Sequence, residues 1–191
     1  MEPRLAAVMG GVVWITGLSG AGKSTIARAV YERLCAHGHA RAALVDGDVF
    51  RALTGADVGH DLEGRLLNAR RIAAYCAARA DEGSLVVCAT MSLFHEIRRW
   101  NRRHVARYLE VYLRAPLEVL VRRDAKGLYR AALAGRVRGV VGVDLPYDEP
   151  AEPDLVLDQG AAPLEVGTAV DVIMQRAAGL GLVGAAGEAS P

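Results

Sequence analysis

The stretch GLSGAGKST, residues 17–25, lies between two short segments of different character. VVWIT (12–16) is an apolar run that predicts a strand, and IARAVYERLCAHG (26–38) has the apolar spacing of a helix. Between them the sequence completes G-x-x-x-x-G-K-S, the pattern of a phosphate-binding loop, with Gly17, Gly22, Lys23 and Ser24.

Each part of this loop has a physical task. Its glycines let backbone N–H groups turn toward a phosphate, and the start of the following helix adds positive potential. We expect Lys23 to reach the β- and γ-phosphates and the Ser24 hydroxyl to coordinate Mg²⁺. The sequence therefore predicts a site for ATP with Mg²⁺, formed by Gly17, Ser19, Gly20, Ala21, Gly22, Lys23, Ser24 and Thr25.

Short apolar runs alternate with longer helical patterns along the rest of the chain. Strands are predicted at 12–16, 42–46, 84–90, 108–114 and 154–158, and helices at 26–38, 65–83, 95–104, 116–124 and 163–179. Strands joined by helical crossovers predict an α/β fold, in which a five-stranded parallel sheet is covered by helices on both faces.

The length of 191 residues favours a single domain, which we place at residues 1–179. Residues 124–150 interrupt the alternation with a basic, glycine-containing insert, for which we predict a lid, with an ordinary surface excursion as the alternative. Small residues dominate 180–191, which we expect to be a disordered tail.

Composition narrows the class of protein. The net charge of +1 argues against nucleic acid as a partner, and no apolar run is long enough to span a membrane. The apolar N-terminal run leads into the glycine loop and reads as a strand, not a signal peptide. Cys35, Cys76 and Cys88 lie far apart in apolar surroundings, which favours buried thiols in a reducing cytoplasm.

The chain has two lysines, whereas its other 21 basic residues are arginines. Lys23 occupies the motif position that requires a compact ammonium group, and Lys126 lies in the insert. We therefore treat Lys126 as a second candidate for contact with phosphate, although chance also explains a single lysine there.

A phosphate-binding loop does not by itself distinguish kinases from switches or motors. The chain has no N-K-x-D motif for reading guanine, and DLEG (61–64) is too short a match to indicate a switch. Asp46 and Asp48 follow the second strand, where extended backbone would direct both carboxylates the same way. One could order Mg²⁺ and the other accept the proton of an attacking hydroxyl, although D-G-D also reads as a simple turn.

In order along the chain, GLSGAGKST, VDGDVFR, RLLNARRI, RRDAKGLYRAALAG and EPDLVLD resemble the adenylylsulfate kinase family. The resemblance covers about residues 12–160. It implies a three-layer P-loop kinase with a lid, as a rule a homodimer, that transfers the γ-phosphate of MgATP to the 3′-hydroxyl of adenylyl sulfate, a small-molecule nucleotide acceptor.

Carried over position by position, the resemblance gives Asp48 the role of catalytic base and Asp46 that of its partner and metal ligand. It makes Arg123 and Lys126 cations that close over the transferring phosphate. The residues that it implies for the acceptor nucleotide are Arg51, Arg65, Asn68 and Ser92.

The chain departs from the family where the acceptor base would stack. Two phenylalanines are usual there, but this sequence has His60 and Val140, and base–aromatic stacking contributes roughly 1–3 kcal/mol per base. Trp100 and Asn101 resemble instead a subgroup of cytidine diphosphoramidate kinases, although Trp100 also reads as a core or interface aromatic. We predict a nucleotide 3′-kinase, with adenylyl sulfate as lead acceptor, cytidine diphosphoramidate as alternative and a non-catalytic nucleotide-binding module as rival.

Overall fold

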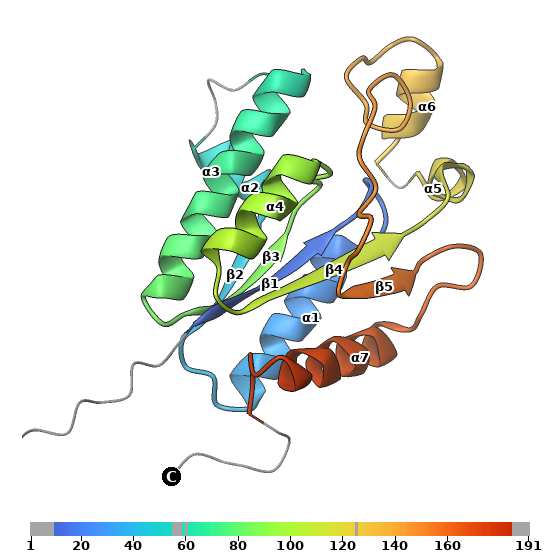
Figure 1. Cartoon of the computed structure of the whole chain (residues 1–191). Coiled ribbons are helices and arrows are strands. Elements are labelled where there is room, and N and C mark those ends of the chain that lie inside the picture. The colour runs from blue at the N-terminus through green and yellow to red at the C-terminus, as the bar shows by residue number, and fades with distance from the viewer. Residues whose placement is uncertain (1–9, 55–58, 60, 125, 185–191) are drawn as a thin grey trace, which may run out of the picture.

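The chain folds into one parallel sheet with helices on both of its faces (Figure 1). The computed structural model describes residues 10–54, 59, 61–124 and 126–184. The strands are β1 (Gly11–Thr16), β2 (Ala42–Asp46), β3 (Leu85–Ala89), β4 (Tyr108–Arg114) and β5 (Leu155–Asp158). The helices are α1 (Lys23–Ala36), α2 (Gly47–Thr54), α3 (Leu62–Asp81), α4 (His95–His104), α5 (Leu117–Arg123), α6 (Leu128–Leu133) and α7 (Val166–Gly179).

All four strand pairings are parallel, in the order β2-β3-β1-β4-β5, so the predicted five-stranded parallel sheet is confirmed. β1 lies at the centre, where Val13 is opposite both Val87 of β3 and Leu109 of β4. Because the sheet is parallel, the carboxyl ends of all strands meet at one edge, which is where ligands bind in such folds.

Two hydrophobic layers hold the helices against the sheet. Val13 and Ile15 of β1 point into the layer beneath α1 and α7, whereas Val12 and Trp14 point into the layer beneath α3. Figure 1 shows α1 and α7 on one side of the sheet and α3 and α4 on the other. A strand buried on both faces explains why VVWIT lacks the polar alternation of a surface strand.

The helix boundaries follow local signals. α1 gives way to Gly38, which adopts a left-handed φ of 80°, and α3 gives way to Gly83 at 88°. α3 begins three residues earlier than predicted, because the Asp61 carboxylate accepts a hydrogen bond of 2.8 Å from the Gly64 N–H. DLEG is therefore a helix cap, in agreement with its rejection as a switch motif.

Two helices and one cysteine differ from expectation. α2 and α6 were not predicted, because each is short and surrounded by glycine and aspartate. Cys76 and Cys88 are buried as predicted, but Cys35 is exposed. The prediction for Cys35 was wrong because α1 buries the face that carries Val30 and Leu34, and residue 35 lies outside that face.

The ordered domain extends beyond the predicted boundary at residue 179. Leu182 and Val183 are buried in the layer that includes α1 and α7. Leu182 lies so close to Gly11 that a side chain at residue 11 would collide with it, and Arg107 donates to the Gly181 carbonyl at 2.9 Å. Residues 185–191, the rest of the predicted tail, lie outside the described part of the chain.

Among the described helices, none is both long and apolar enough to cross a bilayer.

Candidate active site

The phosphate-binding loop connects β1 to α1 at the carboxyl edge of the sheet. Gly17 and Gly22 have φ values of 151° and 94°, a region that favours glycine, and Gly22 is the residue immediately before α1. A side chain at residue 17 would lie 2.5 Å from the Leu113 carbonyl oxygen of β4. The glycines of the motif therefore serve both the turn and the close approach of two strands.

A cavity of about 260 Å³ opens beside this loop. The residues that line it come from the loop, from the ends of β2 and β3, and from the insert: Ser19, Gly20, Gly22, Lys23, Ser24, Thr25, Asp46, Asp48, Ala89, Thr90, Met91 and Lys126. Residues predicted separately from the motif, from D-G-D and from the insert thus meet around one space.

Lys23 is one of the two lysines that line the cavity. Its ammonium donates a hydrogen bond of 2.8 Å to the Leu18 carbonyl, while the residue keeps partial exposure toward the open side. The protein atoms packed around the ammonium lower the pKa of Lys23 to about 8, with a smaller opposing effect from Asp48. Because burial disfavours the protonated form of Lys23, a negatively charged ligand beside it would stabilise that form.

Asp46 joins the end of β2 to the loop and to α2. One carboxylate oxygen accepts a hydrogen bond of 2.5 Å from the Ser24 hydroxyl, and the other accepts bonds from the N–H groups of Asp48 and Val49 at 2.9 and 3.3 Å. Burial raises the pKa of Asp46, but these hydrogen bonds outweigh it and hold the pKa below its usual range. Asp46 is therefore a carboxylate at neutral pH.

The Ser24–Asp46 pair also fits a hard cation. A hydroxyl and an ionised carboxylate side by side are oxygen donors of the kind that Mg²⁺ uses, together with water and substrate phosphates. Ser24 and Asp46, the two residues predicted as metal ligands, would therefore hold Mg²⁺ here. The ion would neutralise charge on the phosphates.

D-G-D is arranged differently from the expectation. Asp48 lies in the first turn of α2 and not in extended backbone, so the prediction that alternation along a strand aligns the two carboxylates was wrong. They share the cavity because Asp46 caps the helix that carries Asp48. The glycine between them is required by packing, since a Cβ at residue 47 would lie 2.8 Å from the Thr90 hydroxyl.

Asp48 meets the insert at the mouth of the cavity. The Lys126 ammonium lies 3.3 Å from an Asp48 carboxylate oxygen, and both side chains are well exposed. An exposed ion pair of this kind adds little to the stability of the fold. It matters because it brings the two side chains together. A carboxylate able to accept a proton and a cation from the insert thus lie together at the cavity that Lys23 also lines.

Three of the residues predicted for the acceptor, Arg51, Arg65 and Asn68, lie on α2 and α3. The Arg51 guanidinium donates to the Gly59 carbonyl at 2.9 Å, and that of Arg65 donates to the Gly139 carbonyl at 2.7 Å. Burial lowers the pKa of Arg65, as does the nearby charge of Arg51, while Asp48 acts in the opposite direction. The two arginines and Asp48 are therefore close enough to act on one another electrostatically.

Asn68 and Ser92 are both buried, at 6% and 1% exposure. Within the described part of the chain, the Asn68 side-chain oxygen and the Ser92 hydroxyl have no hydrogen-bond partner. Unpaired buried polar atoms are costly, so each is a position where a ligand or water atom could bind.

Arg123 and Val140 do not reach the cavity. Arg123 donates to the carbonyls of Gln159 and Gly160 at 2.9 and 2.6 Å, in the loop after β5. Val140 is buried in the core, because the Asp144 carboxylate accepts hydrogen bonds from its N–H and from that of Gly139 and so holds the turn. His60, the other residue at the predicted base site, lies outside the described residues.

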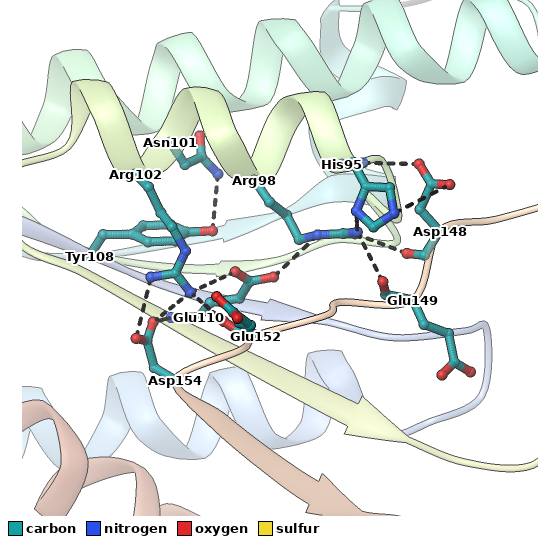
Figure 2. Close-up of polar contacts among 10 residues, drawn as sticks. All are labelled: His95, Arg98, Asn101, Arg102, Tyr108, Glu110, Asp148, Glu149, Glu152 and Asp154. Atoms are coloured by element: carbon teal, nitrogen blue, oxygen red, sulfur yellow. Dashed lines mark hydrogen bonds and ion pairs between the residues drawn. The ribbon is translucent and has the colours of Figure 1, made fainter.

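Trp100 and Asn101 lie on α4, and neither lines the cavity. Trp100 packs at the edge of the core and stacks on His104 with ring centroids 4.3 Å apart. Asn101 is buried and donates to the Tyr108 hydroxyl at 3.2 Å (Figure 2). Of the alternatives left open for Trp100, a structural position is the one observed.

Two arginines of α4 form a polar network with the buried Glu110 of β4 and with residues 148–154, which include the end of the insert (Figure 2). Arg98 and Arg102 approach the buried Glu110 carboxylate at 3.5 and 3.0 Å. Arg98 also donates to the carbonyl of Asp148, and Arg102 lies 3.2 Å from the Asp154 carboxylate. The chain leaving the insert is thus fixed to the sheet and to α4.

Sequence reasoning missed Thr90, Met91 and Tyr129. Thr90 and Met91 line the cavity because they follow β3, and their position after a strand was the available signal. Tyr129 in α6 donates to the Ser19 carbonyl of the phosphate-binding loop at 2.9 Å. Nothing in the local pattern indicates that bond, which joins residues far apart in the chain.

A five-stranded parallel sheet in this order, with a phosphate-binding loop and a carboxylate facing it, defines the class of P-loop kinases. The sequence model of the adenylylsulphate kinase family matches residues 9–158. The chain therefore belongs to the adenylylsulphate kinase family, and it is a phosphotransferase with a hydroxyl group as acceptor.

Relatives and solved structures agree with this assignment. An adenylyl-sulfate kinase of Paraburkholderia xenovorans is 42% identical over 164 residues, which is 85% of this chain and 91% of the relative. The cytidine diphosphoramidate kinase of Campylobacter jejuni is 38% identical over 147 residues, 77% of this chain and 85% of the relative. An APS kinase of Mycobacterium tuberculosis, solved with AMPPNP and APS, superposes with a TM-score of 0.81 at 35% identity and covers 88% of this chain and 97% of its own.

Proposed function

We propose that the protein transfers the γ-phosphate of MgATP to the 3′-hydroxyl of adenylyl sulfate. The observation that carries the proposal is the pair Asp48–Lys126, 3.3 Å apart at the mouth of the cavity that Lys23 and Ser24 line. It puts a proton acceptor and a cation on the acceptor side of a donor loop. A module that only binds nucleotide has no need of either.

The proposed roles follow from the chemistry of each group. Lys23 and the backbone of the loop bind the donor phosphates, and Ser24 with Asp46 holds Mg²⁺. Asp48 accepts the proton of the attacking hydroxyl, and Lys126 neutralises charge on the phosphate as it moves. The acidic end of the acceptor nucleotide binds to Arg51, Arg65 and Asn68, because guanidinium groups pair well with acidic groups.

Cytidine diphosphoramidate remains the second candidate acceptor, for two reasons. A kinase named for that substrate is 38% identical to this chain. In addition, the buried Val140 offers no ring for a large base to stack on at that position. A smaller base that depends less on stacking is compatible with both observations.

The test is a direct assay of the purified chain with MgATP and each acceptor in turn. ADP release and formation of the 3′-phosphorylated nucleotide are measured together, so that hydrolysis is not mistaken for transfer. Adenylyl sulfate should be the better substrate, and Asp48→Asn should lower kcat by about 10²–10⁴. Preference for the cytidine compound would select the second candidate, and no transfer to either would leave the non-catalytic module.

Two further properties are proposed from family membership. We expect a homodimer, because the family resemblance implies one, and we place the protein in the cytoplasm. Light scattering of the purified chain tests the first expectation, and a monomer at micromolar concentration would contradict it.

A further inference from the structure

The insert begins with a turn that is built around a buried carboxylate. Asp124 is 7% exposed, and its two oxygens accept hydrogen bonds from the N–H groups of Tyr129 and Arg130 at 3.1 and 2.9 Å. The Gly127 N–H closes the same turn on the Asp124 carbonyl at 2.9 Å, with Gly127 in the left-handed region at φ 66°. The path of the chain past Lys126 is therefore determined by this turn.

Tyr129 attaches the turn to the donor side of the site. The residue is only 2% exposed, and its hydroxyl donates a hydrogen bond of 2.9 Å to the Ser19 carbonyl in the phosphate-binding loop. Burial, together with the nearby charge of Asp124, raises the pKa of Tyr129 to about 12. The hydroxyl thus keeps its proton and remains a donor at any pH at which the protein works.

The same short segment attaches to the acceptor side through Lys126. Its ammonium lies 3.3 Å from the Asp48 carboxylate, three residues before Tyr129 in the chain. Lys126 itself is well exposed, so packing does not orient its long side chain. Its direction has to come from the backbone, and Asp124 and Tyr129 hold that backbone in place.

We propose that Tyr129 is a positioning residue, which places Lys126 over Asp48 by hydrogen-bonding the phosphate-binding loop. Through this bond the position of the donor loop is transmitted to the cation on the acceptor side. The importance of this arrangement for catalysis rests on the proposed function; the positioning itself does not.

The first experiment reads the position of Lys126 without any turnover. The chain has two lysines, so acetylation with a limiting amount of acetic anhydride, followed by mass spectrometry of the peptides, reports Lys126 separately from Lys23. Tyr129→Phe keeps the buried ring and removes only the hydroxyl. It should raise the rate of Lys126 acetylation at least twofold, since the ammonium spends less time paired with Asp48.

The matched control is Tyr147→Phe. Tyr147 is another tyrosine of the insert, and its hydroxyl contacts the exposed Glu149 at 3.4 Å. This variant should leave Lys126 acetylation within the error of the wild type. Equal rates in wild type and Tyr129→Phe would overturn the proposal, whatever the activity of either protein.

The second experiment is a double-mutant cycle on phosphate transfer. Tyr129→Phe should lower kcat about three- to tenfold, the range expected for one lost hydrogen bond, with KM for ATP nearly unchanged. In a Lys126→Met background the same substitution should cause no further loss, because its effect passes through the lysine. Losses that multiply in the double variant would show a purely structural role and refute the proposal.

The two experiments separate the two claims. If acetylation of Lys126 responds to Tyr129→Phe but no acceptor is phosphorylated, the proposed function fails and the positioning role stands. If transfer occurs but acetylation does not respond, the function stands and the positioning role fails.

Discussion

Lys23 should take up protons when the protein binds ATP. Without ligand its pKa is about 8, because burial opposes the charged form. The phosphates of ATP bring negative charge to the ammonium and raise this pKa again. ATP binding therefore protonates those Lys23 side chains that are neutral in the free protein. The expected uptake is about 0.1 proton per ATP at pH 7, about 0.5 at pH 8 and about 0.9 at pH 9.

The sign of the pH dependence follows from the same shift. A group whose pKa is raised by the ligand favours binding at low pH, so ATP affinity is greatest below pH 8. It should fall above pH 8 with a slope that approaches tenfold per pH unit, until the pKa of the complex is reached. A phosphate group of ATP titrates near pH 6 and adds little in this window.

Isothermal titration calorimetry of MgATP at pH 8, in two buffers of different ionisation enthalpy, measures the uptake. Lys23→Arg is the control, because a guanidinium stays protonated and should show almost no uptake even where binding is weaker. Lys126→Met keeps Lys23 and should still show uptake, somewhat less than the wild type because the charge of Lys126 helps to lower the pKa of Lys23. Equal apparent enthalpies in both buffers for the wild type would refute the reasoning.

Three further predictions concern other parts of the molecule. Truncation after Gly179 removes two buried apolar side chains and should lower the free energy of unfolding by about 3–4 kcal/mol in urea melts, whereas truncation after Gly184 should change it little. Glu110→Gln leaves the α4 arginines without their buried partner and should cost about 3–5 kcal/mol, with the exposed Glu149→Gln as a silent control. Asp46→Asn should raise the Mg²⁺ concentration for half-maximal activity about tenfold, and an unchanged requirement would contradict its role as metal ligand.

The strands could be predicted from the sequence because each is a short apolar run, and β1, β3 and β4 are buried almost throughout. Their boundaries agree with the prediction within one residue. The donor loop could be predicted for a similar reason, since its chemistry is contained in nine consecutive residues. α2 could not, because its start depends on the Asp46 cap and its sequence contains the turn formers glycine and aspartate.

The directions of the Arg123 and Val140 side chains could not be predicted from the sequence. Arg123 turns to the carbonyls of Gln159 and Gly160, which lie in another loop of the fold. Val140 is directed into the core by the hydrogen bonds of Asp144. A motif specifies which residue types are present, but contacts with distant segments decide where their side chains point.

The central place of β1 has a consequence for the order in which the protein can fold during synthesis. β1 pairs with β3 and β4, and β2 pairs with β3, so the first two strands to leave the ribosome have no strand of their own to join. A nascent chain that ends before Leu85 carries two apolar strands and cannot begin the sheet. These strands need protection from aggregation until β3 emerges, and chaperone dependence should therefore be concentrated in the first half of translation.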